Sequence, residues 1–322
     1  MQKAATAIRY VIGIFLITFL VIKVDISNAL ELLRLENWRE TLVGVLSLLF
    51  SLSVLQGARV HYILGKYTST FRNTLNFILV SSFLGTFVPG SVGPDIIRVI
   101  YFKKCSGSDW KRSIYFMSID RLAGFFFLFV VAVFGGVIMF FIDPEKANSF
   151  PPELLAKAGG IIVGVMLLII IVLAVSYRIF VKKGTALYNQ IVEVKLASLF
   201  KFLSVLMALI VLFHAFRSIS VSCLLSALDV NVRLYQVLFC LALTEFISAL
   251  PISVSALGVR EGMLAFSLSL FSVPLEVGLS VAIVFRLFSM ITVLWGGLTY
   301  LFNKKSFDFN KDTADINQMT AM

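Results

Sequence analysis

Long stretches with almost no charge constrain this chain more than any other feature of its sequence. A transmembrane helix needs about 20 mostly apolar residues. Six segments reach or approach that length, at roughly 7–24, 41–64, 113–142, 159–181, 199–225 and 277–302. With 59% hydrophobic and 14% charged residues, a soluble fold could not cover its apolar surface. The sequence therefore predicts an all-α polytopic membrane protein, with residues 1–322 as a single membrane domain.

Two further apolar segments, roughly 74–102 and 234–272, are interrupted by Pro and Gly near the middle. Interrupted helices in a membrane are tolerated only where protein buries them or water fills a cavity, because each unsatisfied amide costs several kcal/mol in hydrocarbon. We therefore expect six transmembrane helices plus two re-entrant helical hairpins whose tips mark a polar cavity. The predicted tip residues are Pro89, Gly90, Ser91, Gly93, Pro251, Ser253 and Gly258.

Positive loop charges predict the orientation, because cytoplasmic loops of membrane proteins retain Lys and Arg. With the N-terminus inside the cell, the predicted cytoplasmic segments contain 16 Lys and Arg, and the outer segments contain 6. This asymmetry requires each interrupted segment to enter and leave the membrane on one side. We predict a multi-pass protein of a bacterial or archaeal cytoplasmic (inner) membrane, with both termini in the cytoplasm.

The remaining six cations all lie inside hydrophobic segments, and all are arginines. They form two series, Arg59, Arg98 and Arg121, and then Arg217, Arg260 and Arg286. The offset is 162 residues from Arg98 to Arg260 and again from Pro89 to Pro251, where each Pro begins a Pro-x-Ser-Val sequence. We infer a duplication with repeat units at 41–142 and 199–302. An odd number of crossings separates the units, so the second is inverted, as in many secondary transporters.

These arginines predict an anionic ligand. One charge at a helix centre costs about 2.5–3.5 kcal/mol on insertion scales, so six need compensation. The intramembrane acids are four, namely Asp95, Asp120, Glu245 and Glu261. An excess of about two positive charges remains, and a guanidinium binds phosphate or carboxylate bidentately. We expect all six arginines to bind substrate, supported by the carboxylates of Asp95, Asp120 and Glu261.

Structural ion pairing is the alternative explanation for any single arginine. Asp95 and Arg98 could pair locally, three residues apart on a helix. Adjacent residues such as Asp120 and Arg121, or Arg260 and Glu261, do not face each other on a helix, so they must pair with other elements. His61, His214 and Glu245 are candidates for proton coupling, although a membrane histidine more often has a structural role.

Several other functions find no support in the sequence. The three cysteines lie far apart and do not have the spacing of a metal site, so we expect no metal and no cofactor. The chain lacks a G-x-x-x-x-G-K-[ST] motif for ATP. It also lacks an aromatic-interleaved basic face, so the net charge of +10 reflects membrane topology and not nucleic-acid binding.

The residues around both interruptions resemble a known family. The resemblance is carried by FLGTFVPGSVGPDIIRVIYFKK (83–104), SIDRLAGFFF (118–127) and ALGVREGMLAF (256–266). These segments are similar to the lysylphosphatidylglycerol synthase transmembrane-region family, also described as flippase-like membrane proteins. The matching positions are Pro89, Gly90, Gly93, Asp95, Arg98, Asp120, Arg121, Gly258, Arg260, Glu261 and Gly262. The resemblance implies lipid translocation; because we expect no aminoacyl transferase domain, it does not imply lysyl transfer by this chain.

The main expectation is a flippase or scramblase that moves a phosphate-bearing lipid headgroup through an Arg-lined polar cavity. The expected partner is the membrane and an anionic lipid of the phosphatidylglycerol, aminoacyl-phosphatidylglycerol or polyprenyl phosphate type. One alternative is a transporter or channel for a small soluble anion. The other is a membrane-embedded transferase acting on a lipid-linked donor, with Asp95 or Glu261 as its acid or base.

Overall fold

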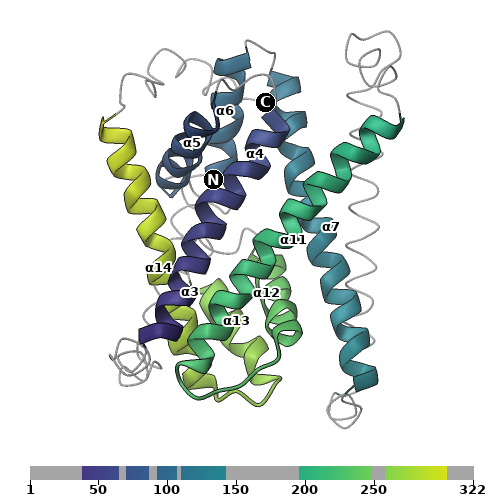
Figure 1. Cartoon of the computed structure of the whole chain (residues 1–322), viewed down its shortest axis with the longest axis vertical. Helices are drawn as coiled ribbons and strands as arrows, with labels where there is room; N and C mark the ends of the chain where they lie inside the picture. Colours follow the sequence, from purple (N-terminus) through teal and green to yellow (C-terminus); the bar gives the residue numbers. More distant parts are fainter. Residues whose placement is uncertain are drawn as a thin grey trace, which may run out of the picture.

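The structure, a computed structural model, describes residues 38–64, 70–86, 93–106, 110–142, 196–248 and 258–302 (Figure 1). Within these residues every regular element is a helix, which confirms the all-α prediction. The predicted spans at 7–24 and 159–181 lie outside the described residues. So do the hairpin tip residues Pro89, Gly90, Ser91, Pro251 and Ser253.

The described helices fall into two groups of similar order, each with a long first element, two short helices and a long last helix. The first group comprises α3 (Trp38–Phe50), the π-helical η2 (Ser51–Leu55), α4 (Gln56–Leu64), α5 (Phe71–Gly85), α6 (Gly93–Ser106) and α7 (Trp110–Ile142). The second group comprises α11 (Leu196–Ser226), α12 (Leu234–Ser248), α13 (Val259–Ser269) and α14 (Leu275–Phe302). Because α3, η2 and α4 follow without a break, they act as one long helix.

Four helices in the described part of the chain are long and apolar enough to cross a membrane. They cover Trp38–Leu64, Met117–Gly136, Lys201–Ser226 and Leu275–Phe302. Four of the six predicted spans coincide with them. The predicted hairpins coincide with the short pairs α5–α6 and α12–α13, whose helices have 15, 14, 15 and 11 residues. At about 1.5 Å per residue, none of these is long enough to cross the hydrocarbon core of about 30 Å alone.

The two short pairs lie toward opposite ends of the molecule. In Figure 1, α5 and α6 are in the upper part of the view, and α12 and α13 are in the lower part. Each pair also packs against the long last helix of the other group, so that α5 contacts α14 and α12 contacts α7. Within the groups, α6 contacts α7 and α13 contacts α14. The contacts of one group thus correspond to those of the other.

Glycines make two of these contacts close. A Cβ atom on Gly296 of α14 would overlap the Leu79 carbonyl oxygen of α5. A Cβ atom on Gly135 of α7 would lie 2.7 Å from the ring of Phe239 on α12. Small residues let helix backbones approach in a membrane, where packing replaces the hydrophobic effect as the driving force. Gly135 and Gly296 therefore allow α12 and α5 to pack closely against α7 and α14.

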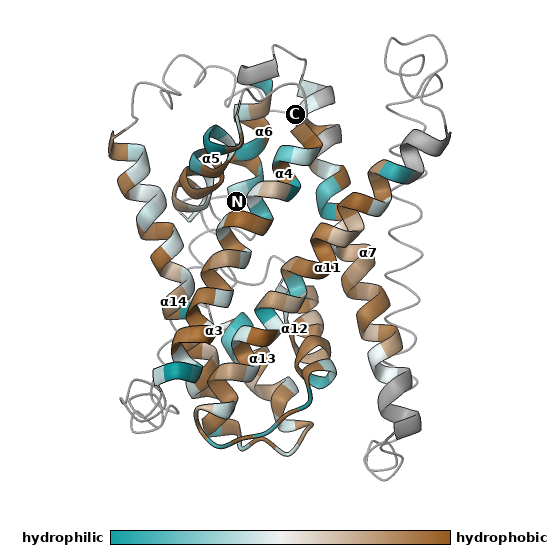
Figure 2. Cartoon of the chain, viewed as in Figure 1, coloured by the Kyte–Doolittle hydropathy of each residue, from teal (hydrophilic) through white to brown (hydrophobic). Residues whose placement is uncertain are grey.

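The outer surface of the long helices is apolar. Brown, hydrophobic residues predominate along α3, α7, α11 and α14 in Figure 2. On α14, large side chains are well exposed, including Leu294 at 66%, Trp295 at 62% and Leu301 at 69%. A soluble monomer rarely exposes a continuous apolar face of this kind, whereas a lipid bilayer solvates it. The buried polar residues lie between the helices and not on this face.

Candidate functional site

A cluster of five charged side chains lies where α11, α12, α13 and α14 meet. We call it the second cluster, and its members are Arg217, Glu245, Arg260, Glu261 and Arg286. Arg217 Nη2 donates to Glu245 Oε1 at 2.6 Å, and Arg260 Nη2 lies 3.6 Å from Glu245 Oε2. Arg286 Nε lies 3.7 Å from Glu261 Oε1. Glu245 therefore joins two arginines that belong to different helices.

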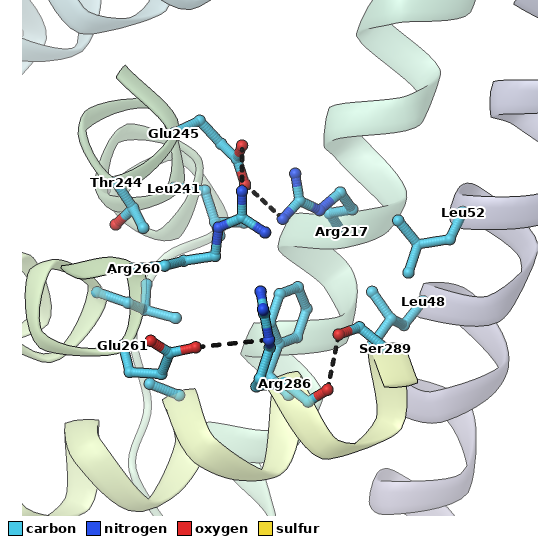
Figure 3. Close-up of a pocket in the computed structure, with 13 residues that line it drawn as sticks. Leu48, Leu52, Arg217, Leu241, Thr244, Glu245, Arg260, Glu261, Arg286 and Ser289 are labelled. Atoms are coloured by element: carbon cyan, nitrogen blue, oxygen red, sulfur yellow. Dashed lines mark hydrogen bonds and ion pairs between the residues drawn. The ribbon is translucent and has the colours of Figure 1, made fainter. Parts of the chain in front are cut away.

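The second cluster lines a pocket (Figure 3). Guanidinium groups of Arg217, Arg260 and Arg286 turn toward one another there, while Leu48 and Leu52 form an apolar wall. The pocket holds about 50 Å³. A single water molecule needs about 10–15 Å³ on this scale, so the space suits a few waters or one compact tetrahedral anion.

Hydrogen-bonding capacity remains unused in this pocket. The Arg217 side chain is 7% exposed, yet its Nε has no hydrogen-bond partner among the described residues. The same holds for Arg260 Nε and Glu261 Oε1. Buried polar atoms are nearly always satisfied in proteins, and the cavity beside these two donors and one acceptor gives room for water or a ligand to pair with them.

The first cluster comprises Arg59, Asp95, Arg98, Asp120 and Arg121, from α4, α6 and α7. Arg59 Nη2 donates to Asp120 Oδ2 at 3.1 Å, and its Nε lies 2.7 Å from Oδ1 in an ionic contact without hydrogen-bond geometry. Asp95 Oδ1 accepts from Arg98 Nη1 at 3.2 Å, and its other oxygen accepts from Arg121. Asp120 and Arg121, which are adjacent in the sequence, thus pair with residues of other helices and not with each other. Asp95 and Arg98 form the predicted local pair.

Polar neighbours fix Arg98 more firmly than the carboxylate alone. Its Nε donates to Ser81 Oγ of α5 at 3.3 Å. Its Nη2 donates to the Gln56 amide oxygen at 2.8 Å when that amide is oriented so that its nitrogen donates to the Leu52 carbonyl. Gln56 begins α4 directly after the π-helical segment, and π-helical turns often occur at functional sites. Arg98 is 5% exposed and makes three kinds of polar contact.

One aromatic residue contacts both clusters. The guanidinium carbon of Arg59 lies 5.1 Å from the centroid of the Phe213 ring, and that of Arg217 lies 5.5 Å from the same centroid. Arg217 also lies 5.5 Å from the ring of Phe285 on α14. The six predicted arginines are therefore divided into two adjacent clusters. The pocket described above is lined by the three arginines of the second cluster, Arg217, Arg260 and Arg286.

The second helix of each short pair begins next to one of the clusters. Gly93 begins α6, which carries Asp95 and Arg98, and Gly258 is the N-cap of α13, which carries Arg260 and Glu261. Glu261 Oε2 accepts from the Gly258 N–H at 2.8 Å. The N-terminal ends of helices carry partial positive charge, which adds to that of the arginines in attracting an anion.

Gly258 has φ 78°, a left-handed conformation that favours glycine. We expect Gly258→Ala to lower the free energy of unfolding by about 1–2 kcal/mol because the new Cβ makes this backbone strained. Thermal unfolding of the detergent-solubilised protein measures the change. Gly124→Ala is the control, since a Cβ at Gly124 in the middle of α7 would meet no atom within 4 Å. Equal destabilisation of both variants would contradict the role of the Gly258 backbone.

The two histidines have different surroundings. His61 Nδ1 lies 3.0 Å from Thr74 Oγ1, at the contact of α4 with α5. His214 is 5% exposed, stacks on Phe127 with a centroid distance of 5.1 Å and follows Phe213 on α11. His61 is thus in a structural contact, while His214 lies beside both clusters.

Sequence reasoning placed the arginines in buried segments but missed several of their partners. Glu245 stays a candidate for proton coupling, and the structure adds that it is the shared ion-pair partner of Arg217 and Arg260. The sequence counted Glu245 among the intramembrane acids but did not assign it these two partners. No sequence signal identified Phe213, Phe285 or Gln56, because aromatic and amide residues are common in membrane helices.

Comparison with known proteins identifies the family. The family model described as "Lysylphosphatidylglycerol synthase TM region" matches residues 6–297. The chain belongs to this family. No curated protein matches the sequence. Membership of the lysylphosphatidylglycerol synthase transmembrane-region family, together with the apolar helices, makes the chain a multi-pass membrane protein of a family connected with lipids.

The family match gives the two clusters a context. Asp95, Arg98, Arg260 and Glu261 lie within the matched region, in the segments that carried the resemblance. Among the described residues, no group of three or more His, Cys, Asp or Glu side chains could hold a metal ion. The titratable groups of the two clusters are guanidinium and carboxylate side chains.

Proposed function

We propose that this protein is a flippase or scramblase that translocates an anionic, phosphate-bearing lipid headgroup across the cytoplasmic membrane. The observation that carries the proposal is the pocket where Arg217, Arg260 and Arg286 converge from three helices with unused donors. The headgroup would bind these guanidinium groups through charge-assisted hydrogen bonds. The acyl or prenyl tails would remain in the bilayer, which the exposed apolar faces of the long helices contact.

The two groups of helices would form inverted repeats, each with one re-entrant hairpin. Their matching order, the exchange of contacts between α5–α14 and α12–α7, and the opposite positions of the short pairs in Figure 1 support this proposal. With both termini cytoplasmic, the first hairpin would approach from the cytoplasm and the second from outside. Each hairpin would then control access to one cluster.

Membrane potential could drive outward movement without ATP. A headgroup with one negative charge gains about 2.3 kcal/mol per 100 mV on moving outward when the inside is negative. That amounts to a concentration ratio of about fiftyfold at 100 mV. A transporter role therefore needs no catalytic chemistry. The transferase alternative would require a free acid or base, whereas Asp95 and Glu261 both have arginine partners.

Reconstitution into liposomes tests the function. Fluorescent phosphatidylglycerol labelled on one acyl chain is quenched from outside by dithionite, so the quenched fraction measures movement between leaflets. We expect the protein to raise the quenched fraction from about half, the value of a sealed bilayer, toward all of it for a scramblase. If the labelled lipid stays in its leaflet while soluble phosphate equilibrates, the small-anion transporter is correct instead.

The Arg260→Gln variant should slow lipid movement. A hydrogen bond between charged groups contributes about 1.5–3 kcal/mol, so we expect about a ten- to hundredfold slower rate. Arg72→Gln is the matched control, because Arg72 is exposed in the first turn of α5 and belongs to neither cluster. Equal rates for Arg260→Gln and the wild-type protein, with both folded, would remove Arg260 from the substrate site.

A further inference from the structure

The two clusters have the same charge balance. Each contains three arginines and two carboxylates, so each has an excess of one positive charge. The segments 87–92 and 249–257, which precede α6 and α13, contain no ionisable residue that could alter this balance. Each cluster is therefore suited to one negative charge, and the pocket of the second cluster has room for one compact anion.

Phe213 contacts an arginine of each cluster. The residue is 7% exposed, and the guanidinium carbons of Arg59 and Arg217 lie 5.1 Å and 5.5 Å from the centroid of its ring. Phe213 and Arg217 are four residues apart on α11, so they share one face of that helix. Arg59 is on α4 and is fixed by its ion pair with Asp120 on α7. The ring thus lies at a contact of α11 with α4 and α7.

An aromatic ring at this place has two physical effects. Its π face attracts both guanidinium groups and keeps them oriented. Its apolar body has no donor or acceptor for a hydrated ion, and narrow apolar constrictions in membrane proteins exclude water and ions. A small anion attracted by one cluster would therefore have to lose its hydration to reach the other.

We propose that Phe213 is the barrier between two half-sites that each bind one negative charge, and that a headgroup passes this ring when it moves between leaflets. This inference rests on the proposed function. It names Phe213 as the residue that makes transport selective for a lipid headgroup over small anions. The barrier prevents the arginine clusters from conducting chloride or phosphate. A lipid headgroup crosses only when α11 and its neighbours move the ring aside.

Chloride flux tests the barrier directly. Liposomes containing the full-length protein, an entrapped fluorescent chloride dye and valinomycin report chloride movement in the same preparation that reports lipid movement. We expect the wild-type protein to be tight to chloride and Phe213→Ala to raise chloride flux about tenfold or more, because the constriction is opened. Phe239→Ala is the control, since Phe239 lies on α12 against Phe271 and Gly135 and outside both clusters.

The outcomes separate this inference from the proposed function. A folded Phe213→Ala protein as tight to chloride as the wild type would overturn the barrier, as would a wild-type protein that itself conducts chloride. Failure of the wild type to move labelled lipid would reject the flippase, while the chloride comparison still decides the barrier. If Phe213→Ala does not fold, Phe213→Trp should slow lipid movement about tenfold while remaining tight to chloride. Unchanged lipid movement in Phe213→Trp would equally overturn the proposal.

Discussion

Glu245→Ala is expected to lower the free energy of unfolding by about 3–5 kcal/mol, because breaking a buried ion pair leaves an uncompensated charge. Glu245 is the partner of both Arg217, at 2.6 Å, and Arg260, at 3.6 Å. Its removal leaves one carboxylate for three arginines of the second cluster. Thermal and denaturant unfolding in detergent, followed by tryptophan fluorescence, measures the loss.

Two further variants define the cause of that loss. Glu245→Gln keeps the volume and one acceptor oxygen, so it should be less destabilising than Glu245→Ala. Glu276→Ala removes an exposed carboxylate from the first turn of α14, where its interaction with the helix dipole is worth about 0.3–1 kcal/mol. Were Glu245→Ala no more destabilising than Glu276→Ala, the arginines would not depend on Glu245 for charge compensation.

Gly296→Ala should be the next most damaging change, with a loss of about 1–3 kcal/mol from overpacking. The added methyl group would overlap the Leu79 carbonyl oxygen, which belongs to the backbone and cannot rotate away. α14 must therefore move away from α5, and with it Arg286, which α14 contributes to the second cluster. We expect both a lower unfolding temperature and slower lipid movement.

Gly136→Ala provides the control for Gly296→Ala. Gly136 also belongs to a glycine pair in a long helix, but a Cβ there would meet no atom within 4 Å. Since Ala is favoured over Gly in helices by about 1 kcal/mol, Gly136→Ala should be neutral or stabilising. Equal destabilisation of the two variants would show that the close contact of α14 with α5 is not required.

Much of the fold could be predicted because hydrocarbon limits what a chain can do. A helix that crosses the bilayer must be long and apolar, so four predicted spans coincide with helices at Trp38–Leu64, Met117–Gly136, Lys201–Ser226 and Leu275–Phe302. Pro and Gly in an apolar segment indicated a break, and the helices on either side of each interruption are separate. Helix geometry also predicted that Asp120 and Arg121 would have different partners, and they do.

The sequence by itself determined that this chain is an all-helical membrane protein with six arginines inside its apolar segments and membership of a lipid-related family. Each of these follows from residue type and spacing along the chain. Only the tertiary structure decided that the arginines form two clusters and not one, and that Glu245 joins Arg217 to Arg260. It also decided that Phe213 contacts an arginine of each cluster. Those contacts join residues up to about 150 positions apart in the sequence. Many weak packing interactions together set how closely the helices approach and how they are rotated, so residue type and spacing do not predict these contacts.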